Sequence, residues 1–299
     1  MYHELRKRGA SHFISAPDGL KLHVRTHGSR AATHLPVVCL PGLARTSADF
    51  DPLAQALAGD AEQPRYLLAL DYRGRGLSDY DPDPGNYNLA VELADVLAVL
   101  TALDIGSAVF IGTSRGGILS MLLGCARPAA IAGVVLNDIG PVIEPQGLAR
   151  IKSYVGKLPE PTSFEDGAEL LRRLFAPQFP ALTPSQWMDH ARRTYRHEGG
   201  RVVANYDPRL AQTLQDIDIE RGLPPLWKEF DSLAHVPIMV IRGANSDLLS
   251  AATVEAMRTR RPCEAIVVPD QGHAPLLMED DVIHRIAAFI AGCDRPGAR

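Results

Sequence analysis

Gly112-Thr113-Ser114-Arg115-Gly116 is the stretch of sequence that decides the fold. It follows the apolar run Ala108–Ile111, which is typical of a buried strand, and it opens the helix-like segment Gly117–Ala126. Glycines on both sides of the serine permit a tight turn and close backbone approach, so the Ser114 hydroxyl is predicted to stand exposed at a strand end. The helix that follows would bring free N–H groups to the place where an oxyanion develops. The stretch therefore predicts a nucleophile for acyl transfer; the alternative is a glycine-rich turn in which Ser114 only caps a helix.

The bulk properties are those of an ordinary globular chain. It has 299 residues, 46% of them hydrophobic and 22% charged, and a formal net charge of −4. The absence of a basic excess argues against a nucleic-acid partner. No apolar run reaches the roughly 18 residues that span a bilayer, so no stable membrane insertion is expected. The N-terminal MYHELRKRGASHF is basic but lacks the apolar core of a signal peptide, which predicts a cytoplasmic location.

Cysteine and histidine spacing gives no sign of a metal or a cofactor. The four cysteines are Cys39, Cys125, Cys263 and Cys293. None forms a CxxC pair, and their apolar surroundings predict reduced thiols in the core. His23 and His27 are the only histidines four residues apart, and no carboxylate accompanies them on their predicted strand. We expect neither a metal site nor a bound cofactor.

Strand and helix patterns alternate over most of the chain. The predicted strands are Ser11–Ala16, Leu20–His27, Val37–Leu40, Tyr66–Asp71, Ala108–Ile111, Gly133–Leu136, Pro237–Arg242 and Ala265–Val268. Helices are predicted around 49–58, 89–103, 117–126, 251–261 and 279–291. This alternation predicts an α/β fold with a mostly parallel sheet, helices on both faces and an antiparallel hairpin at one edge. Residues 140–230 interrupt the alternation, so we expect a core made of 1–139 and 231–299 and a helical cap made of 140–230.

An acid and a base follow Ser114 in an order that suits a catalytic triad. Asp247 lies in the loop after the strand Pro237–Arg242, and His273 in the loop after Ala265–Val268. Both are therefore predicted at the carboxyl edge of the sheet, where ligands bind in such folds. We predict His273 as the base and Asp247 as its orienting acid. Asp138, which follows the strand Gly133–Leu136, is the alternative acid.

Two backbone N–H groups are predicted to form an oxyanion hole. One belongs to Arg115, directly after the nucleophile, and the other to Leu43 in the turn Pro41-Gly42-Leu43, with Ala44 as the alternative donor. The Arg115 guanidinium would either attract an acidic substrate or, the simpler interpretation, brace nearby carboxylates. The glycines of the Asp71–Asp79 segment lack dinucleotide-loop spacing, which predicts a structured turn.

With these motifs in place, the chain resembles the α/β-hydrolase fold superfamily over about 1–140 and 231–299, and within it bacterial carboxylesterases with a helical cap. The resemblance depends on Gly112–Gly116, Asp71–Ser78, Asp247 and Gly272-His273. It implies a cofactor-free serine hydrolase. A serine nucleophile argues against the dehalogenase and epoxide-hydrolase members, which use aspartate. The oxyanion loop departs from the family's common His-Gly, because Pro41-Gly42 stands there.

The predicted cap is rich in aromatic side chains. Of the eight phenylalanines, eight tyrosines and two tryptophans, nine lie in it: Tyr154, Phe164, Phe175, Phe179, Trp187, Tyr195, Tyr206, Trp227 and Phe230. Together they favour a small, uncharged, partly apolar ester as substrate. The alternatives are a C–C bond hydrolase, a lactonase or an amidase with the same triad, and a ligand-binding protein without turnover. The sequence does not reveal the oligomeric state.

Overall fold

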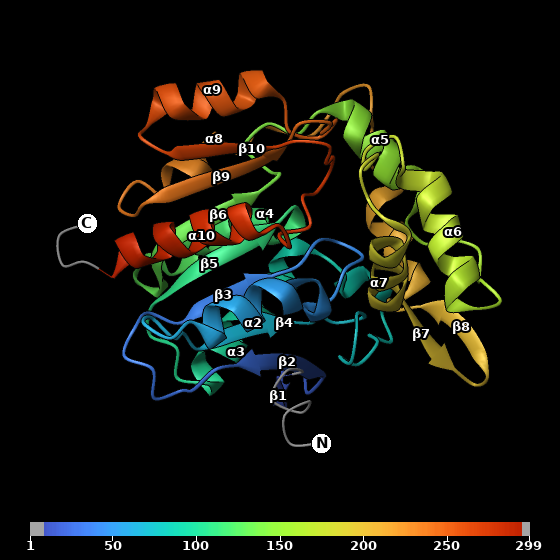
Figure 1. Ribbon diagram of the computed structural model, residues 1–299, viewed down its shortest axis with the longest axis horizontal. Helices are drawn as coiled ribbons and strands as arrows, with labels where there is room; N and C mark the ends of the chain where they lie inside the picture. The colour runs from blue at the N-terminus through green and yellow to red at the C-terminus, as the bar shows by residue number, and fades with distance from the viewer. Residues whose placement is uncertain (1–8, 295–299) are drawn as a thin grey trace.

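The computed structural model describes residues 9–294, which are built around one eight-stranded sheet (Figure 1). Its strands in chain order are β1 (Ala10–Ser15), β2 (Lys21–His27), β3 (Val37–Leu40), β4 (Leu67–Leu70), β5 (Ala108–Thr113), β6 (Ile131–Asn137), β9 (Ile238–Gly243) and β10 (Glu264–Val268). Their order across the sheet is β1-β2-β4-β3-β5-β6-β9-β10. β1, β2 and β4 pair antiparallel, and all other neighbours in this sheet pair parallel. The predicted parallel sheet with an antiparallel hairpin at its edge is confirmed.

Both faces of the sheet are buried. The central strands are apolar throughout, and successive side chains point to opposite faces of the sheet. Val37 and Cys39 point to one face, and Val38 and Leu40 to the other. The helices that enclose the sheet are α2 (Asp51–Gly59), α3 (Leu89–Ala102), α4 (Arg115–Ala126), α8 (Trp227–Asp231), α9 (Ala251–Arg260) and α10 (Asp280–Cys293). Apolar residues of α2 and α10 cover the first face, and those of α3, α4, α8 and α9 cover the second.

The helix termini carry the signals that the physical chemistry of helices requires. The Asn88 side chain accepts from the Val91 N–H at the start of α3, and Ser250 does the same for Thr253 at the start of α9. Two acidic residues lie in the first turn of α10, where the helix dipole favours negative charge.

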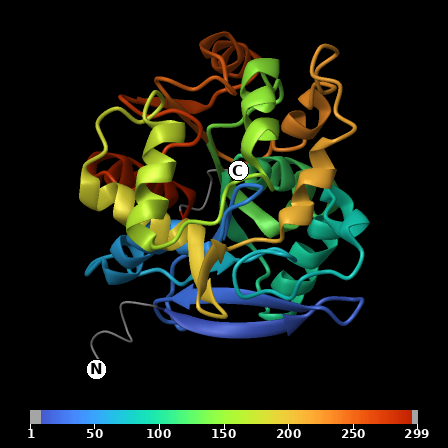
Figure 2. The same ribbon diagram turned by 90° about the vertical axis from the view of Figure 1, so that its right-hand side faces the viewer.

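The segment between β6 and β9 lies beyond the carboxyl edge of the parallel strands (Figures 1 and 2). It contains α5 (Pro145–Tyr154), α6 (Phe164–Phe175), α7 (Pro184–Thr194), β7 (Tyr195–Glu198) and β8 (Arg201–Ala204). α6 and α7 enclose an apolar cluster of their own, which includes Leu171, Trp187 and Tyr195. The β7–β8 hairpin was not predicted. α8 contacts α4, and its Phe230 is buried in the main core, so not all of 140–230 lies over the site.

The prediction that the cysteines lie in the core is correct for two of the four. Cys39 and Cys293 are buried, and burial raises the pKa of the Cys293 thiol to about 11. Cys263 is half-buried, and Cys125 is exposed because its face of α4 is not covered.

No helix within residues 9–294 combines the length and the apolar character that crossing a membrane requires.

Candidate active site

Ser114 occupies a sharp turn between β5 and α4, as its flanking glycines predict. Its φ of 52° lies in the left-handed region, which a non-glycine residue adopts only when its surroundings hold it there. A Cβ on Gly112 would approach the backbone of Gly116 to 2.5 Å, and a Cβ on Gly116 would collide with the Leu40 carbonyl. Both glycines are therefore needed for close packing of β5, β3 and α4, which fixes the serine at the sheet edge.

His273 lies within hydrogen-bonding distance of Ser114 and of one carboxylate. Its Nε2 is 2.9 Å from Ser114 Oγ, and its Nδ1 is 2.8 Å from Asp138 Oδ2. The His273 backbone N–H also donates to Gln178 Oε1 at 3.0 Å, which ties the loop after β10 to the segment between α6 and α7. A carboxylate on Nδ1 leaves Nε2 of the neutral ring to accept the serine proton.

The carboxylate partner of His273 is Asp138, which directly follows β6. It is fully buried and also accepts from the Gly243 N–H at 2.8 Å and from Ser246 Oγ at 2.5 Å. Three donors therefore satisfy a carboxylate that would otherwise be costly to bury. Its φ of 53° turns the backbone sharply at the strand end.

The prediction that Asp247 is the acid that contacts His273 is wrong. Asp247 lies four residues beyond the end of β9. Its neighbour Ser246, and not Asp247, contacts the carboxylate that faces His273, because the Ser246 hydroxyl donates to Asp138. The Asp247 carboxylate instead accepts two hydrogen bonds from Arg150 on α5, at 2.6 and 2.9 Å. Burial favours a higher pKa for Asp247, but the hydrogen bonds and charge of Arg150, together with Gln178, hold the pKa below its usual range.

The predicted oxyanion loop lies beside Ser114. A Cβ on Gly42 would be 3.8 Å from Ser114 Cβ. The Gly42 carbonyl accepts from the Arg45 N–H at 3.2 Å, and the Leu43 carbonyl accepts from Arg75 Nε at 2.8 Å. Arg115 is the first residue of α4, where an N–H has no partner inside the helix. The roles of the Leu43 and Arg115 N–H groups remain predictions.

The Arg115 side chain braces a buried carboxylate. Its Nε lies 2.5 Å from Glu92 Oε2, and the other Glu92 oxygen is 2.9 Å from Arg75 NH1. Glu92 and Arg75 are fully buried. The simpler interpretation of Arg115 therefore agrees with the structure, and sequence analysis missed Glu92, which lies on the inner face of α3.

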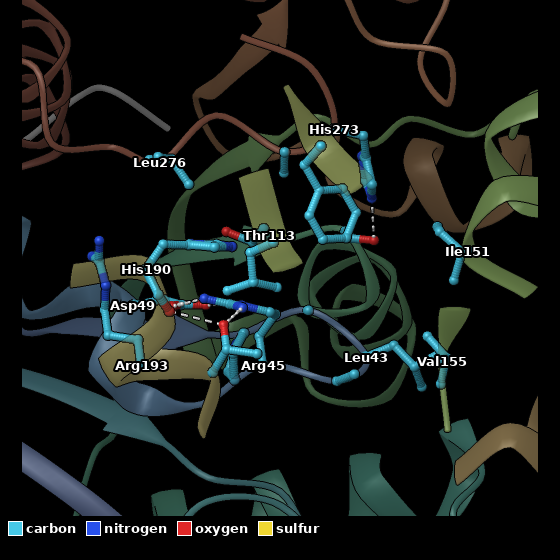
Figure 3. Close-up of a pocket in the computed structure, with 18 of the residues that line it drawn as sticks. Leu43, Arg45, Asp49, Thr113, Ile151, Val155, His190, Arg193, His273 and Leu276 are labelled. Carbon is cyan, nitrogen blue, oxygen red and sulfur yellow. Dashed lines mark hydrogen bonds and ion pairs between the residues drawn. The ribbon is translucent and has the colours of Figure 1, made fainter. Parts of the chain in front are cut away.

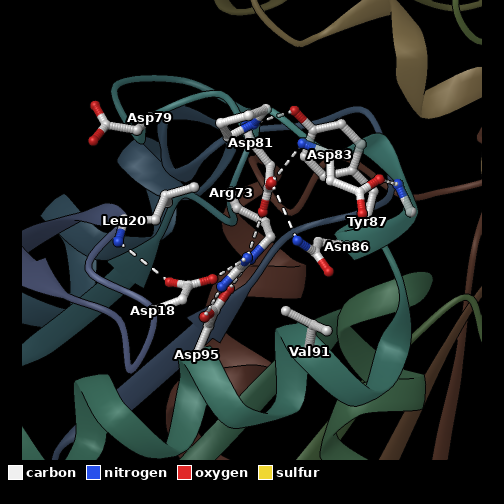
Figure 4. Close-up of polar contacts among 12 residues, drawn as sticks. Asp18, Leu20, Arg73, Asp79, Asp81, Asp83, Asn86, Tyr87, Val91 and Asp95 are labelled. Atoms are coloured by element: carbon white, nitrogen blue, oxygen red, sulfur yellow. Dashed lines mark hydrogen bonds and ion pairs between the residues drawn. The ribbon is translucent and has the colours of Figure 1, made fainter.

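The Asp71–Asp79 segment is a structured turn, as predicted. Arg73 is buried and forms ion pairs with Asp18, Asp81 and Asp95 at 2.6–2.8 Å (Figure 4). This network anchors the turn that presents Arg75 to the Leu43 carbonyl.

Two cavities meet at Ser114. The smaller measures about 130 Å³, includes His273 in its lining and extends to the Arg45–Asp49 pair (Figure 3). The larger measures about 580 Å³. Ser114, Leu43 and Ile151 line both. Four of the nine aromatic residues line the smaller cavity: Tyr154, Phe175, Phe179 and Tyr206.

Within residues 9–294, no three or more His, Cys, Asp or Glu side chains are grouped as a metal site would require.

Comparison with known proteins identifies the class that this geometry suggests. The model of the alpha/beta hydrolase family matches residues 37–288, so the chain belongs to this family and is a hydrolase. The fold is that of an α/β-hydrolase.

Individual relatives match over most of their length. The chain is 32% identical to 3-hydroxybutyrate-oligomer hydrolase of Cupriavidus necator over 86% of this chain and 88% of that protein. It is 27% identical to 2-(acetamidomethylene)succinate hydrolase of Mesorhizobium japonicum over 88% and 90%. A crystal structure of an alpha/beta hydrolase from Novosphingobium aromaticivorans is 38% identical, covers 94% of this chain and 98% of that one, and has a TM-score of 0.86.

Proposed function

We propose that this hydrolase cleaves carboxylic esters through an acyl-enzyme, with Ser114 as nucleophile, His273 as base and Asp138 as the acid that orients it. The observation that carries the proposal is the continuous chain of contacts from Ser114 Oγ through both ring nitrogens of His273 to Asp138. A serine hydroxyl is a poor nucleophile until an imidazole accepts its proton, and a buried carboxylate stabilises the imidazolium that forms.

The reaction follows from these contacts. Ser114 Oγ attacks the ester carbonyl while its proton passes to His273 Nε2. The N–H groups of Leu43 and Arg115 stabilise the resulting oxyanion. The intermediate collapses, the alcohol leaves with the proton from His273, and the acyl group stays on Ser114. His273 then takes a proton from water, which attacks the acyl-enzyme; the acid is released as His273 returns the proton to Ser114 Oγ.

Two observations support an ester as substrate. The cavities at Ser114 are lined largely by apolar side chains with a few polar groups, a composition suited to small, partly apolar ligands. The name of the Cupriavidus necator relative describes hydrolysis of 3-hydroxybutyrate oligomers, and hydroxy acids oligomerise through ester bonds. Residues 140–230 act in this proposal as a cap, of which α5 to α7 cover the site.

Amide hydrolysis is the second candidate, because the name of the Mesorhizobium japonicum relative describes hydrolysis of an acetamido compound. A p-nitrophenyl ester and a p-nitroanilide that carry the same acyl group distinguish ester hydrolysis from amide hydrolysis. We expect the ester to be hydrolysed and the anilide to be inert.

The decisive experiment compares wild type with Ser114→Ala on p-nitrophenyl esters from acetate to palmitate. Loss of a triad nucleophile costs on the order of a million-fold in kcat, so the variant should be inactive. Exposed Ser29→Ala is the matched control and should retain full activity. Labelling by a fluorophosphonate should occur in wild type and disappear in Ser114→Ala. Turnover that survives in a folded Ser114→Ala variant contradicts the proposal.

A further inference from the structure

The two cavities differ in their relation to the proposed base. His273 belongs to the lining of the smaller cavity, whereas the lining of the larger, drawn from residues 9–294, does not include it. Ile118, Ile139 and Leu148 give the larger cavity an apolar wall. In acyl transfer the leaving oxygen must receive its proton from the base. On the proposed ester mechanism, on which this inference rests, the alcohol half of the substrate therefore occupies the smaller cavity and the acyl half the larger.

The far end of the smaller cavity contains a paired acid and base. Arg45 holds Asp49 through two hydrogen bonds of 2.6 and 2.5 Å (Figure 3). Its third nitrogen donates to Thr194 Oγ1 at 2.7 Å. Burial favours a higher pKa for Asp49, but the Arg45 cation holds the pKa below its usual range. The charges of this pair cancel, so the pair alone attracts neither sign of ligand.

Arg193 adds a positive charge that this pair does not cancel. It lines the same cavity from α7, and its Nε donates to the backbone carbonyl of Asp189 at 3.2 Å. Within residues 9–294 no carboxylate forms an ion pair with its guanidinium, and Arg193 acts electrostatically on both Asp49 and His190. The end of the cavity therefore carries a net positive charge.

His190 adds an unused polar group one turn earlier on α7. Its Nδ1 is buried and has no hydrogen-bond partner among the described residues. Burial, together with the nearby Arg45 cation, lowers the pKa of His190 well below its usual value, so the ring is neutral and one of its nitrogens carries a proton. A buried polar atom without a partner is unfavourable, because it has lost its hydrogen bonds to water. A ligand that supplies the partner removes this cost.

We propose that the smaller cavity is a leaving-group subsite for hydroxy acids, in which Arg193 and His190 bind the free carboxylate of the alcohol half of the ester. The substrate class is then an acyl ester of a short hydroxy acid. A carboxylate matches a guanidinium with free terminal nitrogens and a histidine with an unpartnered nitrogen. The subsite replaces the uncharged ester predicted from sequence with a negatively charged one, because an uncharged ester would leave both groups without a partner.

Two compounds that differ only in charge test this subsite. One is 3-(butyryloxy)butyrate, and the other is its neutral primary amide, 3-(butyryloxy)butyramide; butyrate release is measured for both. We expect kcat/KM for the carboxylate to exceed that for the amide by about tenfold or more in wild type, since a hydrogen bond to a charged group is stronger than one to a neutral amide. Arg193→Gln should reduce this ratio to near one, mainly through KM. Arg192→Gln, an exposed neighbour paired with Asp189, is the matched control and should keep the ratio.

The possible outcomes separate this inference from the proposed function. Equal kcat/KM for the two compounds, with p-nitrophenyl butyrate still hydrolysed and that activity lost in Ser114→Ala, overturns the subsite alone. A preference that persists in Arg193→Gln overturns the assignment to Arg193. Failure of folded wild type to hydrolyse any of the three esters overturns the ester mechanism itself.

Discussion

The sheet edge and the segment above it use charged groups in opposite ways. At the sheet edge, Asp138, Glu92 and Arg75 are fully buried, and each carboxylate is paired or hydrogen-bonded. In the segment above, Arg150 forms a partly exposed pair with Asp247 of the loop after β9, and Arg193 has no carboxylate partner in the described part of the chain. Groups of the first kind are held rigidly, as a reaction with fixed geometry requires. Groups of the second kind are accessible to a ligand.

Asp138 and Asp247 show this difference most directly. Both follow strands at the carboxyl edge of the sheet, yet Asp138 faces His273 while Asp247 faces α5. The role of a carboxylate at this edge therefore depends on which donors reach it.

Asp138→Asn should have the largest effect in this comparison. The amide no longer favours the correct histidine tautomer or stabilises the imidazolium, so kcat should fall by about 10³–10⁴. Asp247→Asn should change kcat by less than about tenfold, which corresponds to about 1.4 kcal/mol of barrier. Steady-state kinetics on p-nitrophenyl butyrate, with circular dichroism as a check of folding, compare the two. A greater loss in Asp247→Asn would reverse our assignment of the acid.

Arg75→Lys should have an intermediate effect. A lysine keeps the positive charge beside Glu92 but lacks the fork that also donates to the Leu43 carbonyl. A displaced oxyanion loop should lower kcat by about tenfold with little change in KM. The same assay measures this, with thermal unfolding as a second readout. An unchanged kcat in the folded variant means that the loop is held by other contacts.

Asp247→Asn should have its main effect on stability. Folding lowers the pKa of Asp247. Its ionised form therefore stabilises the fold at pH values above its pKa in the unfolded chain, about 3.9. This contribution is lost as the pH falls through the lower pKa of the folded protein. Urea unfolding at pH 7 should show a deficit of about 1–2 kcal/mol for the variant, since the pair is partly buried.

The deficit should shrink only below about pH 4. Exposed Asp216→Asn is the control and should show none at pH 7. A deficit that is the same at pH 3 and pH 7 argues against the ion pair as its source.

The sequence by itself determined the strand and helix alternation, the turn at Ser114, and Ser114 and His273 as a pair at one edge. These features depend on patterns within short stretches of sequence: the spacing of apolar residues, the positions of glycines, and the loops that follow strands. Tertiary structure decided which aspartate meets His273, which charges line the smaller cavity, and how Arg75 reaches Leu43. Such contacts join residues far apart in the chain, and an offset of a few residues past a strand end redirects a side chain from the histidine to a helix of another layer. Local sequence patterns predict which residues lie at the edge of the sheet, but the packing of distant segments determines which partner each of them contacts.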